Sequence, residues 1–131
     1  MEKFKAVREW GQKRGIDGCS FQRQYQRTLQ EVVEIHDAYN DNDSKEIADA
    51  IGDSIVTLIN LAKTVNMKAE DCLGQAFDVI ELRKGLNFNG DFVRYGKLSA
   101  EHQKICDEKQ GNPGSEYYKR DADLSPEDFK Y

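Results

Sequence analysis

Apolar side chains recur every three or four residues along most of the first 84 positions, which is the pattern of amphipathic helices. The first of these stretches covers residues 2–14 and ends near Gly15, the glycine that follows it. The second begins after a cap at Ser20 and continues to about Tyr39. Its apolar stripe comprises Phe21, Tyr25, Leu29, Val32, Val33 and His36.

Two further helices follow the polar stretch N-D-N-D-S. Ser44 is the expected cap of the third helix, which continues to about Val65. The fourth covers residues 68–84, with Gly85 as its C-terminal stop. We expect the apolar stripes to face inward; on these two helices they comprise Ile47, Ile51, Ile55, Leu58, Ala62 and Val65, and then Leu73, Ala76, Phe77 and Ile80.

The last third of the chain has a different pattern. An Asn89-Gly90 pair between short apolar runs predicts a β-hairpin. Residues 99–110 are compatible with another helix, and the tail beyond it is expected to be loosely held or docked on a neighbour. The sequence therefore predicts an all-α, antiparallel four-helix-type bundle with a small hairpin and an extended tail. We place the helical domain at 1–98 and the C-terminal helix and polar tail at 99–131.

Composition narrows the range of partners. Of the 131 residues 33% are charged, and the formal net charge is −5. An acidic chain argues against nucleic acid or a membrane as the main partner, although it can bind phosphates through a metal ion. Cys19, Cys72 and Cys106 lack metal-ligand spacing, and we expect neither a signal peptide nor a membrane span. The expected location is the cytoplasm, or the host cytoplasm if a phage encodes the protein.

Acidic residues gather on one face of each of two consecutive helices. Glu31 and Glu34 are three residues apart on the second helix, and Glu46, Asp49 and Asp53 share a face of the third. Helices joined by a short loop lie antiparallel, so these two faces can converge. A set of oxygen ligands without histidine or cysteine favours Mg²⁺, or Mn²⁺ in its place, over zinc.

A solvated helix face is the simpler explanation for such residues, and it suits Glu31, Glu34 and Glu46. It suits Asp53 less well, because this aspartate is the only charged residue between Ala50 and Ala62. A buried carboxylate without a partner costs several kcal/mol. Asp53 is therefore the strongest single sign of a metal site.

These motifs resemble those of the MazG-like all-α nucleoside triphosphate pyrophosphohydrolases, in their small single-domain, phage-type branch. That family carries E-x-x-E on one helix and E-x-x-D on the next. Q-E-V-V-E-I matches the first motif, and A-D-A-I-G-D-S-I-V-T-L-I-N-L-A matches the second. V-R-E-W-G-Q-K-R-G-I and I-E-L-R-K-G-L-N-F-N-G-D-F-V are also similar, so that the resemblance covers about residues 5–97. Ala50 stands where the family usually has glutamate, which leaves Asp49 or Glu46 as the fourth ligand.

The resemblance implies hydrolysis of a nucleoside triphosphate, with dGTP or dCTP favoured, to the monophosphate and pyrophosphate. It implies that Glu31, Glu34, Asp49 and Asp53 hold Mg²⁺, with Glu46 as the alternative fourth ligand. Glu34 is the expected catalytic base, which orients or deprotonates the attacking water.

Residues for the rest of the substrate are also proposed. Arg83 and Lys84 match the basic cluster of the family and would bind phosphate, although they could equally complement a helix dipole. Lys63 is a further phosphate-binding candidate. Gln24, Asn87 and Trp10 are the candidates for binding the base, although aromatic residues at helical spacing usually pack in a core.

The resemblance further implies a homodimer or homotetramer and a role in controlling the nucleotide pool. Three alternatives stay open. One is a non-catalytic helical module that binds a basic partner through its acidic face, and another is a phosphohydrolase acting on guanosine alarmones. The third is a metal-dependent phosphatase that releases orthophosphate.

Overall fold

The computed structural model describes residues 2–111 and 121–131. It divides into two compact units, Met1–Gly74 and Gln75–Tyr131, and each unit is described here by itself. The described residues contain five α-helices and one two-stranded hairpin, so the chain is mainly helical, as predicted. The boundary that we placed between residues 98 and 99 lies inside the second unit.

The first unit contains three helices before α4. These are α1 (Glu2–Lys13), α2 (Phe21–Asn40) and α3 (Ser44–Thr64), with the short 3₁₀ turn Ile16–Gly18 between the first two. The hydroxyl of Ser20 accepts a hydrogen bond from the backbone N–H of Arg23, which confirms the predicted cap of α2. Asp43, and not Ser44, caps α3, because its carboxylate accepts from the N–H of Glu46 at 3.1 Å.

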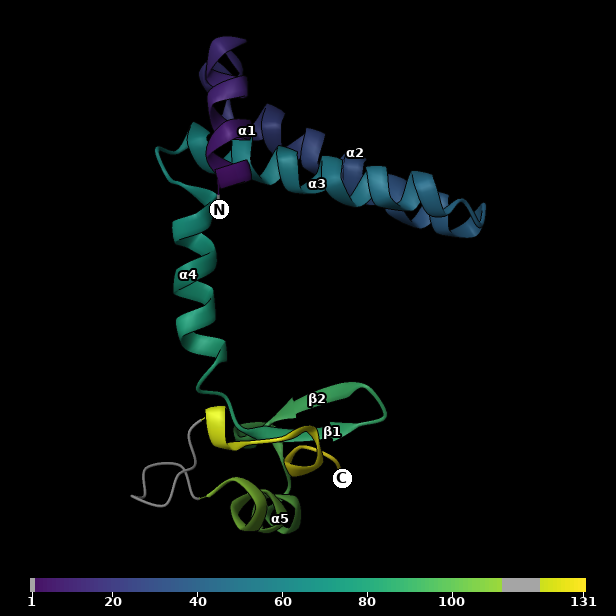
Figure 1. Cartoon of the computed structure of the whole chain (residues 1–131), viewed down its shortest axis with the longest axis vertical. Helices are drawn as coiled ribbons and strands as arrows, with labels where there is room; N and C mark the ends of the chain where they lie inside the picture. The colour runs from purple at the N-terminus through teal and green to yellow at the C-terminus, as the bar shows by residue number, and fades with distance from the viewer. Residues whose placement is uncertain (1, 112–120) are drawn as a thin grey trace. The chain divides into compact units, whose positions relative to one another are not determined.

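α2 and α3 form an antiparallel helical hairpin, and α1 crosses it at the end that contains the start of α2 (Figure 1). A tight turn joins the two long helices, and within it Asn42 adopts a positive φ of 53°. The amide Nε2 of Gln24 donates to the backbone oxygen of Thr57 at 3.2 Å, which ties the start of α2 to the middle of α3.

The seam between α2 and α3 consists of small and polar side chains. Short side chains allow the two helices to approach closely, and the buried Gln24 amide is paired, as a buried polar group must be. The buried residues of the two helices are Gln24, Thr28, Ala38, Ala50, Ser54, Thr57, Ile59 and Asn60.

Our prediction that the apolar stripes face inward is wrong for this chain. Val33 is 59% exposed and Leu58 is 48% exposed, and most of the large apolar residues of both stripes are similarly open. The reason is that each helix has three faces at about 100° per residue: one at the seam, one acidic or polar, and one apolar. Periodicity identified the apolar face of each helix correctly. It could not show that α2 and α3 contact each other through a different face.

α4 (Ala69–Ile80) carries the junction between the two units. Its first turn is tied to α1 by an ion pair between Arg8 and Glu70. The helix ends at Ile80, four residues before the predicted end at residue 84. Gly85 is not its stop but the first residue of a strand, where a Cβ would lie 2.1 Å from the backbone oxygen of Val93.

The second unit contains the predicted hairpin. Strands β1 (Gly85–Phe88) and β2 (Asp91–Arg94) pair antiparallel, with Leu86 opposite Val93. The turn residues Asn89 and Gly90 have φ values of 53° and 98°. Two successive positive φ angles are the requirement of a type I′ turn, so the Asn-Gly signal is confirmed.

α5 (Ala100–Gln110) packs against β1 and confirms the helix predicted at 99–110. Leu86, Leu98 and Cys106 form the buried core of this unit. The last residues of the chain dock beside β1, where the N–H of Asn87 donates to the backbone oxygen of Phe129 at 2.6 Å. The tail is therefore held by its own unit over these residues. Residues 112–120 of the tail, for which we made the same prediction, lie outside the described residues.

No helix among residues 2–111 and 121–131 is both long enough and apolar enough to cross a membrane.

Candidate active site

Both helices of the hairpin contribute to an acidic face, and Asp53 in its α3 part lies beside α1. On α2 this face contains Glu31 and Glu34, and Asp53 belongs to the adjoining face of α3. Asp53 lines a cavity of about 430 Å³ whose other walls come from α1 and Val56. α1 therefore borders Asp53 on one side, but Asp53 itself is exposed, so the burial that we expected for this carboxylate is not found.

The exposure and the pKa of Glu31 show how close these carboxylates lie to one another. Its side chain is only 12% exposed. Burial raises the pKa of Glu31, and so do the charge of Glu34, a hydrogen bond with the Glu34 carboxyl group, and the charge of Asp53. Arg27 acts in the opposite direction but does not cancel these effects. The structure thus brings three of the predicted ligands within electrostatic range of one another.

The candidates for the fourth ligand stand apart from this acidic trio, Glu31, Glu34 and Asp53. Asp49 and Glu46 occupy the same face of α3 as Asp53, about one and two turns nearer its N-terminus, and both are exposed. Neither is among the groups that shift the pKa of Glu31. The choice between them stays a prediction.

The donor set of the trio fits a hard cation. All its donor atoms are carboxylate oxygens, which Mg²⁺ prefers, and a cation would relieve the repulsion that raises the pKa of Glu31. Within the described residues no three acidic, histidine or cysteine side chains are arranged to bind one ion. A Mg²⁺ ion commonly keeps several waters and uses only one or two carboxylates, and the trio can supply that number.

A second cavity, of about 440 Å³, lies beside the trio. We call it the Trp10 cavity; it is lined by Trp10, Ile16, Cys19, Arg23, Gln24, Arg27, Val56, Thr57 and Asn60. Trp10 and Val56 also line the cavity that contains Asp53, so the two hollows share a wall. Polar groups meet an aromatic face here, and such a mixture suits a small organic ligand.

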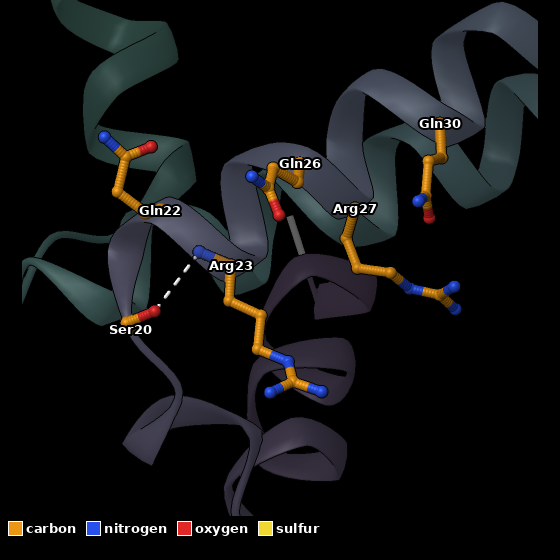
Figure 2. A pocket seen from close by; sticks show the side chains of 6 residues that line it. All are labelled: Ser20, Gln22, Arg23, Gln26, Arg27 and Gln30. Carbon is orange, nitrogen blue, oxygen red and sulfur yellow. Dashed lines mark hydrogen bonds between the residues drawn. The ribbon is translucent and has the colours of Figure 1, made fainter.

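A third hollow, of about 550 Å³, opens on the outer side of α2 (Figure 2). Only polar side chains line it: Ser20, Gln22, Arg23, Gln26, Arg27 and Gln30. Arg23 and Arg27, one turn apart, extend toward the same side of the helix in Figure 2. Both arginines also line the Trp10 cavity, so they stand between the two hollows.

The other predicted site residues divide between the two units. Trp10 and Gln24 meet in the Trp10 cavity, and Lys63 lies one turn beyond Asn60 in α3. Arg83, Lys84 and Asn87 belong to the second unit, so their role in the site stays a prediction. Lys84 is buried, and the side-chain oxygen of Asn87 accepts from the N–H of Gly90 at 2.6 Å.

Sequence reasoning missed Arg23, Arg27 and Asn60. The signal for the arginines was present, because positions 23, 27, 31 and 34 follow one another at helical spacing and so share a side of α2. Extending the face of the E-x-x-E motif by two turns toward the N-terminus would have found them. Nothing in the sequence distinguished Asn60 from a polar surface residue.

No protein-family model, curated protein or solved structure matches this chain.

Proposed function

We propose that the protein is a Mg²⁺-dependent pyrophosphohydrolase that converts a nucleoside triphosphate to the monophosphate and pyrophosphate. The observation that supports this most is the acidic trio, in which burial and then the charges of Glu34 and Asp53 raise the pKa of Glu31. Carboxylates held close enough to repel are unfavourable unless a proton or a cation joins them. The adjacent Trp10 cavity provides room for a nucleoside beside these acids.

The roles of the acids follow from their positions. Bound Mg²⁺ would polarise the phosphoryl oxygens and lower the pKa of an attacking water. Glu31, the most enclosed of the three, and Asp53 would hold the ion. Glu34 is exposed and can reach a water, so it would orient that water and accept its proton. Asp49 or Glu46 would complete the ligand set from the same face of α3.

The oligomer is part of the same proposal. The exposed apolar stripes of α2 and α3 lie beyond the seam from the acidic face, and both helices contribute large side chains to them. Two helices of nearly equal length, 20 and 21 residues, make a face that a second copy can match by two-fold symmetry. Pairing two hairpins in this way would give a four-helix bundle and leave both acidic faces accessible.

The test is a panel of canonical and modified deoxynucleotides, with Mg²⁺ or with EDTA, and with the products resolved by chromatography. Pyrophosphate and a monophosphate should appear from at least one substrate, with dGTP and dCTP the first to examine. Asp53→Asn should abolish the reaction while its circular dichroism spectrum stays that of the wild type. Asp37→Asn is the matched control, because Asp37 is an exposed aspartate of the same hairpin.

Other outcomes would replace the proposal. Release of orthophosphate would indicate a phosphatase, and turnover of guanosine tetraphosphate alone would indicate an alarmone hydrolase. If no nucleotide is cleaved, if divalent ions leave the melting temperature unchanged and if Asp53→Asn raises it, the acidic face is a binding surface for a basic partner.

A further inference from the structure

A triphosphate brings several negative charges to a site that is already acidic. Metal ions neutralise part of this charge, and phosphoryl-transfer sites usually add arginine or lysine side chains. The two cations that we predicted for this purpose, Arg83 and Lys84, belong to the second unit. The first unit has arginines of its own, and two of them lie beside the acidic trio.

Two of its arginines are already engaged. Arg8 forms an ion pair with Glu70. The guanidinium of Arg14 lies 4.5 Å from the centre of the Trp10 ring and donates to the backbone oxygen of Trp10 at 3.1 Å. The first contact ties α1 to α4 and the second positions Trp10, so neither arginine is the natural partner of a phosphate.

Arg23 and Arg27 are placed differently. Both line the Trp10 cavity and the polar hollow of Figure 2. Nη2 of Arg27 lies 3.8 Å from a carboxylate oxygen of Glu31, which connects this pair to the acidic trio. Arg23, Arg27 and Glu31 follow at intervals of four residues, so that they extend over about 12 Å along α2.

We propose that Arg23 and Arg27 bind the polyphosphate of the substrate, and that the Trp10 cavity behind them takes its nucleoside. The inference rests on the proposed function, since it assigns the substrate contacts of that same site. Guanidinium groups bind phosphate through paired, charge-assisted hydrogen bonds. When a cation occupies the acidic trio, Glu31 no longer needs Arg27, and the guanidinium can turn to the phosphates.

The cavity behind the arginines carries the polar groups that a base requires. Gln24 is 5% exposed and its Nε2 is held by the oxygen of Thr57, so its Oε1 is left to accept from a ligand. Asn60 is 6% exposed, and it lies at the wall of the same cavity. A side-chain amide there can both donate a hydrogen bond to a base and accept one from it. The ring of Trp10 offers the flat face on which a base can stack.

The experiment compares ligands with and without a polyphosphate. Binding of the non-hydrolysable α,β-methylene analogues of dGTP and dCTP, and of dGMP and dCMP, is measured calorimetrically with Mg²⁺ on the intact chain. Arg23→Gln and Arg27→Gln should each weaken binding of a triphosphate analogue roughly 10- to 100-fold, the effect of losing a charged hydrogen bond. The two arginine substitutions should change binding of the monophosphate far less, whereas Trp10→Ala should weaken binding of both the triphosphate analogue and the monophosphate.

Lys45→Gln is the matched control, because it removes one positive charge from the far end of the same hairpin. The proposal fails if the arginine variants bind the triphosphate analogue as tightly as Lys45→Gln does, or if the wild-type protein binds no triphosphate analogue at all. Arginine-dependent binding without any release of pyrophosphate from natural triphosphates would leave this inference standing and overturn the proposed reaction instead.

Discussion

Arg27 and Glu31 approach each other to 3.8 Å, yet the pKa of this glutamate is raised. The arginine is 63% exposed at its side chain, so water screens its charge, whereas Glu31 is enclosed beside two other acids. Burial and like charges therefore outweigh the ion pair. The exposed guanidinium of Arg27 does not neutralise Glu31 fully, and a divalent cation would stabilise its ionised form more strongly.

The first prediction concerns the dependence of stability on pH. The pKa of Glu31 in the folded protein is raised above its ordinary value of 4.5, so the folded state binds its proton more tightly than the unfolded state does. Its contribution to stability is then fully present below about pH 4.5 and is lost as the pH rises through the folded pKa. At pH 7 and without metal, Glu31→Gln should raise the melting temperature by about 2–4 °C.

Divalent ions should reverse this effect. Mg²⁺ binds the ionised carboxylates, so saturating Mg²⁺ should raise the melting temperature of the wild type more than that of Glu31→Gln. Glu108→Gln, an exposed glutamate of α5, is the control and should respond as the wild type does. Equal responses of wild type and Glu31→Gln to Mg²⁺ would remove Glu31 from the metal site. Scanning calorimetry at pH 5 and pH 7 provides the measurement.

The second prediction tests how α1 closes over the site. Gly11 is buried, and a Cβ built on it would lie 2.5 Å from Oδ1 of Asn60. Alanine normally stabilises a helix by about 1 kcal/mol relative to glycine. Here the clash should exceed that gain, and Gly11→Ala should lower the free energy of unfolding by about 1 kcal/mol or more.

A double-mutant cycle separates the clash from helix propensity. In an Asn60→Ala background the obstructing amide is absent, so Gly11→Ala should become neutral or stabilising. Denaturant titrations of the four proteins give the coupling energy. A destabilisation that is the same in both backgrounds would mean that Gly11 is required for some reason other than the proximity of Asn60.

The sequence predicted the local elements well and their packing poorly. Ser20 and the Asn89-Gly90 pair act through neighbouring backbone groups, and such signals are visible in the sequence itself. The faces that meet were not visible, because small residues such as Ala50 and Ser54 form the seam while the apolar stripes stay outside. Periodicity reports how apolar each face is and does not report which neighbour covers it.

In the candidate site, too, the local features were predictable from the sequence and the tertiary contacts were not. The spacing of Glu31 and Glu34 predicted a shared face, and the structure places them in contact. The convergence of Asp53 with them depended on two helices lying antiparallel, which the short loop made predictable. The Trp10 cavity was not predictable, since it forms only where α1 crosses the hairpin and brings Trp10 beside Gln24. Tertiary contacts of this kind leave no periodic signal.

The third prediction concerns the exposed apolar face. Leu58 is 48% exposed in the single chain, so Leu58→Glu removes only part of a core residue's packing there and should leave the helical content nearly unchanged. If a second copy covers this face, the substitution buries a charge in the interface and should dissociate the oligomer. Sedimentation equilibrium should show oligomeric wild type and monomeric Leu58→Glu. Gln26→Glu, on the polar side of α2, is the control; a monomeric wild type would contradict the assembly.

The fourth prediction concerns Gln110, which is fully buried in the second unit. Its Nε2 donates to the backbone oxygens of Gly85 at 2.7 Å and Asp128 at 2.6 Å, and its Oε1 accepts from the N–H of Gly85 at 3.1 Å. One side chain therefore joins α5, the start of β1 and the C-terminal segment. Gln110→Leu preserves volume but removes this partner from the buried N–H and oxygen of Gly85, at about 1–3 kcal/mol each, and one partner from the partly buried oxygen of Asp128.

The loss should be local to this unit. Amide hydrogen exchange should accelerate at Asn87 and Tyr131, whose N–H groups bond between β1 and the C-terminal segment, while α2 and α3 keep their protection. Gln103→Leu is the matched control, because Gln103 donates only one hydrogen bond, to the backbone oxygen of Tyr95 at 3.0 Å, and should cost about 1 kcal/mol. Equal effects of the two substitutions would show that the C-terminal segment is held by the aromatic contacts of Tyr131 with Phe88 and His102 instead, since ring packing does not depend on the Gln110 amide.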